Sequence, residues 1–162
     1  MKSLNRKDSE ESKLMKERGQ SLVELGISLL ILLYLLCGAV EFGILFFQFV
    51  QLRDAAQEGA LYGSMNPPSS AADTVAINKI KERARYSSPT QSPIDLINDP
   101  AVVVNVDVTD AQYCEGGSLQ VTVSYPHKIF MPFMPQLLGK TADPYIDLNA
   151  RVTDTILTPI CP

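Results

Sequence analysis

The sequence predicts an α+β protein: a long N-terminal transmembrane α-helix followed by a small exported domain with an antiparallel sheet. Three observations support this fold class. They are an uncharged apolar run near the N-terminus, a proline-containing stop over 66–70, and alternating apolar and polar residues in the second half. The expected organisation is a cytoplasmic leader over 1–19, an N-terminal helix over 20–65 and an exported head over 66–162.

The leader and the body differ in charge. Residues 1–19 hold six basic and four acidic residues, and the rest of the chain holds eight basic and fourteen acidic ones. Basic residues before an apolar span keep the N-terminus cytoplasmic, so the head is expected outside the cell membrane. The acidic body argues against a nucleic-acid partner, because such proteins show a basic stripe. The polar leader lacks helical periodicity and is expected to be disordered.

The apolar run is long enough to cross a bilayer. No charged residue occurs from Leu25 to Val40, and after Glu41 the run resumes through Val50. About 20 helical residues span the hydrocarbon core, so a single transmembrane segment is expected over about 25–47. The run is too long for a secretory signal, and no A-x-A-like site follows it. Proline cannot continue a helix, which places the helix end before Pro67.

Small residues recur every four positions along this helix. Such residues let helices approach closely. One interpretation is packing against helices of other subunits, and the other is a stem resting on its own head. The residues are Ala39 and Gly43 in one series, and Ala55, Gly59 and Gly63 in another, with Ala56 and Ala60 beside them.

The head contains one predicted helix and three predicted strands. Periodicity predicts a surface helix over Asp73–Tyr86, with Val75, Ile77 and Ile80 inward. Alternation predicts strands over 102–109, 119–125 and 146–152. Prolines in the apolar stretch 126–144 exclude a regular central strand there. This stretch either covers the sheet as core or forms an exposed patch.

The three cysteines divide between the span and the head. Cys37 lies in the span and is expected to act as a small apolar residue. Cys114 and Cys161 lie in the exported part, where disulfides persist, and are predicted to pair. The alternative is two free thiols.

No pattern for catalysis or cofactor binding is found, so the chain is not expected to be an enzyme. His127, the only histidine, is interpreted as structural. Asp107, Asp110 and Glu115 surround one predicted hairpin. They are interpreted as solvated turn acids, with a calcium ion as the alternative.

Glu24 is a carboxylate at the start of the apolar run, where lipid makes a charge costly. Cleavage after Gly19 would create a positively charged amino terminus at Gln20. The amine of one subunit would then attract Glu24 of its neighbour, offsetting burial and setting the register between helices.

The run Gly19–Glu24 followed by an apolar helix resembles the prepilin-peptidase site of type IV pilins and pseudopilins. The resemblance implies cleavage of the Gly19–Gln20 bond and an assembly role for Glu24. Gln20 replaces the aromatic residue usual after the glycine. The runs 40–43 and 55–63 resemble the TadE-like family, the minor pilins of tight-adherence, Flp-type pilus systems.

The resemblance implies a function in assembling a pilus for surface attachment. The implied partners are a prepilin peptidase, other pilin or pseudopilin subunits, the pilus assembly platform and the membrane. The alternative is a signal-anchored extracytoplasmic binding protein that is not assembled into a pilus.

Overall fold

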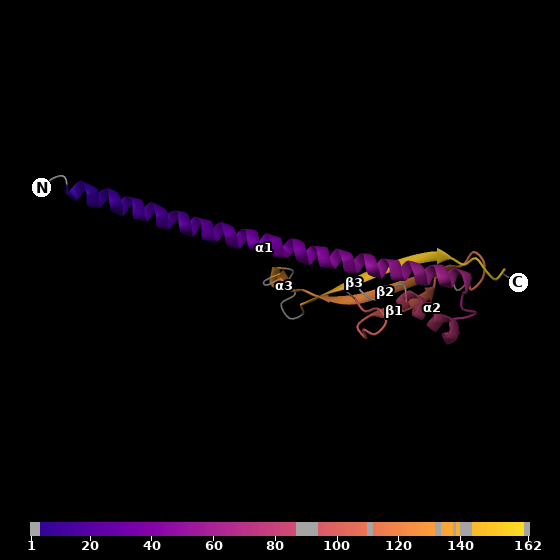
Figure 1. The fold of residues 1–162 in the computed structure, drawn as a ribbon. Coiled ribbons are helices and arrows are strands. Elements are labelled where there is room, and N and C mark those ends of the chain that lie inside the picture. The colour runs from indigo at the N-terminus through magenta and orange to yellow at the C-terminus, as the bar shows by residue number, and fades with distance from the viewer. Residues whose placement is uncertain are drawn as a thin grey trace. The chain divides into compact units, whose positions relative to one another are not determined.

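The computed structural model describes residues 4–86, 94–109, 112–131, 134–137, 139 and 144–160, with side chains described from residue 19 onward. The helices are α1 (Leu4–Met65), α2 (Thr74–Tyr86) and α3 (Met134–Leu137), and the strands are β1 (Val103–Val108), β2 (Ser118–Lys128) and β3 (Tyr145–Thr155) (Figure 1). The chain divides into two compact units, 1–41 and 42–162, and each is described by itself. A long apolar helix followed by a three-stranded antiparallel sheet confirms the α+β prediction.

Helix α1 begins at Leu4, well before the expected start near Gln20. The prediction of disorder over residues 1–18 was wrong for residues 4–18, which form helical backbone. The leader lacks proline and is rich in lysine, arginine and glutamate, which favour helix even without an apolar stripe. The helix ends at Met65, just before Pro67 as predicted. Its apolar part is long enough to cross a membrane.

The head sheet has the order β1-β2-β3, with both outer strands antiparallel to β2. All three predicted strands are confirmed, but β2 runs further than expected, through Pro126 to Lys128. The expectation that proline excludes a central strand here was wrong. Ile129 N donates to Pro144 O at 2.9 Å, so odd-numbered residues at this end of β2 bond towards β3. The nitrogen of Pro126 therefore points away from β3 and beyond the described end of β1, where no N–H is required.

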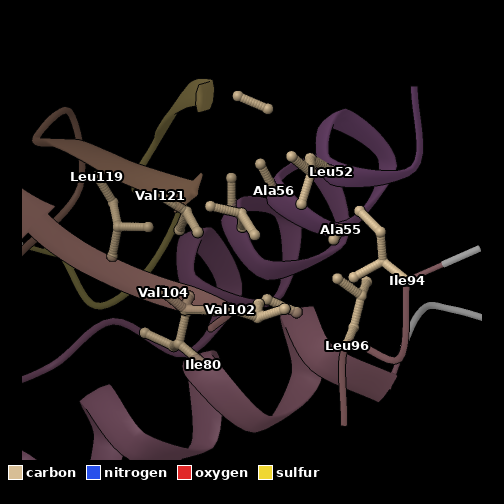
Figure 2. Close-up of a cluster of buried hydrophobic side chains, with 14 of the residues drawn as sticks. Leu52, Ala55, Ala56, Ile80, Ile94, Leu96, Val102, Val104, Leu119 and Val121 are labelled. Carbon is tan, nitrogen blue, oxygen red and sulfur yellow. The ribbon is translucent and has the colours of Figure 1, made fainter. Parts of the chain in front are cut away.

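The core lies on one face of the sheet, between the strands and the two longer helices (Figure 2). Leu52 of α1, Ile80 of α2, and Leu119 and Val121 of β2 are fully buried. The opposite face of the outer strands carries exposed polar residues, including Asn105 and Arg151. The alternation in the sequence is therefore the alternation between a buried and a solvated face.

Helix α2 is capped by Asp73. The backbone N–H of Ala76 donates to Asp73 Oδ1 at 3.1 Å, and the backbone N–H and hydroxyl of Ser69 donate to Oδ2 at 3.1 and 2.9 Å. These hydrogen bonds, led by the Ser69 N–H, lower the pKa of Asp73 below its ordinary value of 3.8. Ile80 is buried as predicted, but Val75 is 66% exposed. It precedes Ile80 by five residues, which places it about 140° away around the helix.

The apolar stretch after β2 matches both interpretations offered for it. Ile129 and Met131 are buried, whereas Phe130 is 71% exposed. The Phe130 ring also meets the His127 ring edge to face, with 6.1 Å between centroids. Phe133 and Leu138, two further apolar residues of this stretch, lie outside the described residues.

Candidate processing and packing site

The predicted cleavage site lies on the exposed surface of α1. Gly19, Gln20 and Glu24 are all exposed and belong to one helical face, which continues through Val23, Ile27 and Ser28. Residues four apart share a face, so the Gly19–Gln20 peptide bond and the Glu24 carboxylate lie on the same side of the helix. Apart from the adjacent turns of α1 itself, no described atom lies within 4 Å of the position that a Cβ would take at Gly19.

The helix surface beyond this site is strongly apolar and exposed. Leu30 and Phe42, for example, are each 70% exposed, and large apolar side chains are exposed from Leu22 to Val50. Soluble monomers rarely expose apolar surface of this extent. Such a surface is suited to lipid or to the apolar helices of other subunits.

The two series of small residues have different environments. Ala55, Gly59 and Gly63 are buried against the chain's own head. A Cβ at Gly59 would lie 2.9 Å from Ala84 Cβ, and a Cβ at Gly63 would lie 2.8 Å from Leu119 Cδ2. The structure therefore places this series in the contact between stem and head.

The other series remains available for contacts with partners. Ala39 and Gly43 are exposed, and apart from the adjacent turns of α1 itself no described atom lies within 4 Å of a Cβ built at Gly43. Exposure allows helix-to-helix packing at these positions, and that role stays a prediction.

Two glutamines of α1 form buried polar contacts that the sequence did not indicate. Oε1 of Gln48 lies 2.6 Å from Nδ1 of His127. Gln51 donates through Nε2 to Ile94 O at 2.7 Å and accepts from Ile94 N at 3.3 Å through Oε1. An amide satisfies buried polar groups in this way and so fixes the chain segments that carry them. The only signal in the sequence was two glutamines, three apart, at the end of an apolar run.

The structure tests the predictions for Cys37 and Cys114 but not for Cys161. Cys37 is an exposed free thiol, and Cys114 is disulfide-bonded. Cys161 lies outside the described residues, so its pairing with Cys114 stays a prediction. The segment that follows Cys114 and the segment that precedes Cys161 lie side by side. Glu115 N donates to Pro159 O at 2.7 Å, and Gly116 N donates to Ile156 O at 3.0 Å. Gly116 has a φ of 88°, a left-handed value suited to glycine, in this turn.

The remaining predicted residues form no recognisable reaction centre in the described part of the chain. His127 is buried and bonded to Gln48, as expected of a structural histidine. Among the described residues, no three metal-ligating side chains lie together, and Asp110 falls outside that part of the chain.

Comparison with known proteins identifies the N-terminal segment. Residues 19–61 match the family model described as TadE-like protein. This segment is TadE-like. The match confirms the resemblance inferred from the sequence, and it covers about a quarter of the chain. No curated protein and no solved structure matches the chain.

The TadE-like segment contains most of the candidate site. It begins at Gly19, includes Glu24 and Gly43, and ends within the small-residue series that contacts the head. The sheet and α2 lie outside the TadE-like match.

Proposed function

We propose that this chain is a minor pilin or pseudopilin of a tight-adherence, Flp-type pilus. A prepilin peptidase cuts the Gly19–Gln20 bond, and the mature chain takes part in assembling a pilus for surface attachment. The chain is the substrate in this reaction and not an enzyme. The observation that carries the proposal is the TadE-like match, which starts at the glycine of the cleavage site and extends along the apolar helix.

Membrane anchorage follows from the same helix. The proposed orientation is single-pass, with the N-terminus cytoplasmic and the head extracytoplasmic. It is supported by the basic leader before the apolar segment and by the disulfide at Cys114, which suits an oxidising compartment. Gly19 and Gln20 lie at the leader end of the apolar segment, where a peptidase at the cytoplasmic membrane face would reach them.

Glu24 is proposed to direct assembly after cleavage. The new amine at Gln20 and the carboxylate of a neighbour's Glu24 attract strongly in the low dielectric of apolar surroundings. Both groups lie at the same end of α1, so two helices of the same direction can pair amine with carboxylate after a small axial shift. The exposed Ala39 and Gly43 would let other pilin helices approach this part of the stem.

The mass of the native N-terminus tests the proposal. In cells with an active prepilin peptidase, the mature chain should begin at Gln20. A Gly19→Leu variant should retain its leader, and a Gly26→Leu variant provides a matched glycine control within the same helix. A wild-type chain that still begins at Met1 beside a correctly processed major pilin would overturn the proposal.

A further inference from the structure

The two outer strands of the head sheet have open edges over Val103–Val108 and Tyr145–Thr155. The helices bond to these edges only beyond the strands, where Arg85 donates to Val102 O at 2.9 Å and Leu157 N donates to Ser64 O at 2.9 Å. Within the described residues, β1 and β3 each pair with β2 on one side only. Such an edge presents backbone N–H and C=O groups that can pair with another strand. Strand β3 is 11 residues long, an unusually extended edge for a small sheet.

The hydrogen bonds at the strand ends show which backbone groups point outward. On β3, Ile156 N donates to Gly117 O at 2.7 Å, so even-numbered residues bond towards β2 and odd-numbered ones point to the open edge. On β1, Thr109 N donates to Ser118 O at 2.9 Å, so odd-numbered residues bond towards β2 and even-numbered ones point outward. The two edges therefore differ in the parity of their free backbone groups.

Strand direction decides how two anchored copies can join. An antiparallel β3–β3 contact requires a two-fold axis perpendicular to the sheet, which reverses every direction in the sheet plane. The segment of α1 from Phe42 to Met65 lies along the sheet (Figure 1), so this segment would run in opposite directions in the two heads. That arrangement is incompatible with anchorage in one membrane. Strands β1 and β3 are parallel to each other, so pairing β3 of one copy with β1 of the next keeps every α1 in the same direction.

The backbone and side chains of the two edges are compatible in this parallel arrangement. In a parallel ladder, a residue with inward-facing N–H and C=O lies opposite a residue whose own groups face away. Odd residues of β3 therefore lie opposite odd residues of β1. These odd positions carry the exposed side chains on both strands, which are polar except for Val103 and Tyr145 at the strand starts, so the solvated face continues from one copy to the next.

Charge selects one register of this pairing. Placing Arg151 opposite Asp107 also places Asn149 opposite Asn105, and it stacks half-buried Val152 beside half-buried Val108 on the core face. A shift of four residues would instead oppose Asp147 and Asp107, two like charges. Within the described residues, neither Arg151 nor Asp107 has an ion-pair partner of its own.

We propose that the heads of successive copies join edge to edge, β3 of one against β1 of the next, with Arg151 opposite Asp107 across the contact. The partner is a second copy of this chain, and the contact is head to tail, so it propagates beyond a dimer. This inference rests on the membrane anchorage in the proposed function, because anchorage excludes the antiparallel alternative.

Cysteine cross-linking of the full chain tests the register. The test chain carries Asn105→Cys and Asn149→Cys in a Cys37→Ala background. It is expressed together with a prepilin peptidase, and the membranes that contain it are then oxidised. The expected product is a ladder of dimers, trimers and larger species, while either single variant gives no ladder. Strong dimers from Asn149→Cys alone would indicate the antiparallel contact and overturn the proposal. Products containing a different protein, found in native membranes in place of the ladder, would overturn the choice of partner.

Charge reversal tests the proposed ion pair independently. Adding Arg151→Asp to the double-cysteine chain should abolish the ladder, and adding Asp107→Lys to that variant should restore it. Lys128→Asp in the double-cysteine chain is the control and should leave the ladder unchanged. The Arg151→Lys chain, without added cysteines, offers a second route, since a carbodiimide should join the introduced amine to Asp107. Loss of both kinds of cross-link in a chain whose N-terminus is correctly processed overturns this inference alone. An unprocessed chain that still forms the ladder contradicts the cleavage claim alone.

Discussion

Nδ1 of His127 lies 2.6 Å from Oε1 of Gln48, joining the end of the central strand to α1 across 79 positions of the chain. Both side chains are buried. The amide oxygen can only accept, so the imidazole donates from Nδ1. This hydrogen bond fixes the last residues of β2 on the stem.

Replacing Gln48 should therefore destabilise the head. Gln48→Ala removes the acceptor for a buried imidazole N–H, at an expected cost of about 1–3 kcal/mol in the free energy of unfolding. Thermal unfolding of the full chain in detergent would measure it. Gln57→Ala, at an exposed position of the same helix, is the matched control. Equal stabilities of the two variants would contradict a stabilising role for the contact.

Replacing glycine by alanine should lower the stability of the head at Gly59 but not at Gly43. Gly59→Ala places a Cβ 2.9 Å from Ala84 Cβ, a short side chain that cannot rotate away, so α2 must shift. Overpacking of this kind costs about 1–3 kcal/mol, only partly offset by the better helix propensity of alanine. Gly43→Ala meets no described atom within 4 Å and should not lower the melting temperature.

Assembly provides the complementary measurement for these glycines. If Gly43 contacts another pilin helix, Gly43→Leu should reduce pilus assembly while the head keeps its wild-type melting temperature. Normal piliation with Gly43→Leu would remove Gly43 from the packing surface.

The cap of α2 predicts a specific pH dependence. The pKa of Asp73 is lowered on folding, so the folded state holds its proton less readily than the unfolded chain. The carboxylate therefore contributes stability above about pH 4, and that contribution is lost as the pH falls through the lowered pKa. Asparagine caps helices without titrating, so the stability difference between wild type and Asp73→Asn should change between pH 7 and pH 3. Asp54→Asn, an exposed change on α1, is the control. A pH-independent difference for Asp73→Asn would contradict this role.

Glu24→Ala should separate cleavage from assembly. The substitution leaves the Gly19–Gln20 bond intact, so the N-terminus should still be processed, while loss of the carboxylate should prevent incorporation. Glu24→Gln keeps the size of the side chain but not its charge and should also prevent incorporation, whereas Glu24→Asp should retain part of the incorporation. Normal assembly by Glu24→Ala would favour a signal-anchored binding protein outside the pilus.

The disulfide prediction can be tested on gels. The exported chain should migrate faster without reductant, and Cys114→Ser and Cys161→Ser should each remove that difference. Closing this loop restricts the unfolded chain, so either variant should unfold about 2–4 kcal/mol more easily. Identical migration with and without reductant, together with two titratable thiols in the head, would reject the pairing.

Local patterns predicted most of the fold. Period-2 alternation located all three strands, and Pro67 marked the end of α1, because both signals act within a few residues. The start of α1 was missed because lysine and glutamate favour helix without an apolar pattern. Pro126 was misjudged because its effect depends on which side of β2 has a neighbouring strand, and the sequence does not state this.

Local patterns also predicted one part of the candidate site and missed another. Gly19 and Glu24 were found from their spacing before an apolar helix, and the family match begins at that glycine. The burial of Ala55, Gly59 and Gly63 could not be decided, since a small residue fits equally well against another subunit or its own sheet. The pairing of Gln48 with His127 depends on tertiary packing over a long separation, which no local pattern encodes.

The close fit of Gly59 and Gly63 to the head has a consequence for filament geometry. It fixes the helix from Phe42 to Met65 in one rotational setting about its own axis relative to the sheet. Turning the helix by one residue would push larger side chains into Ala84 and Leu119. In any assembly built on this part of the stem, the helical face that contacts a neighbouring subunit therefore also determines the direction in which the head projects from the assembly.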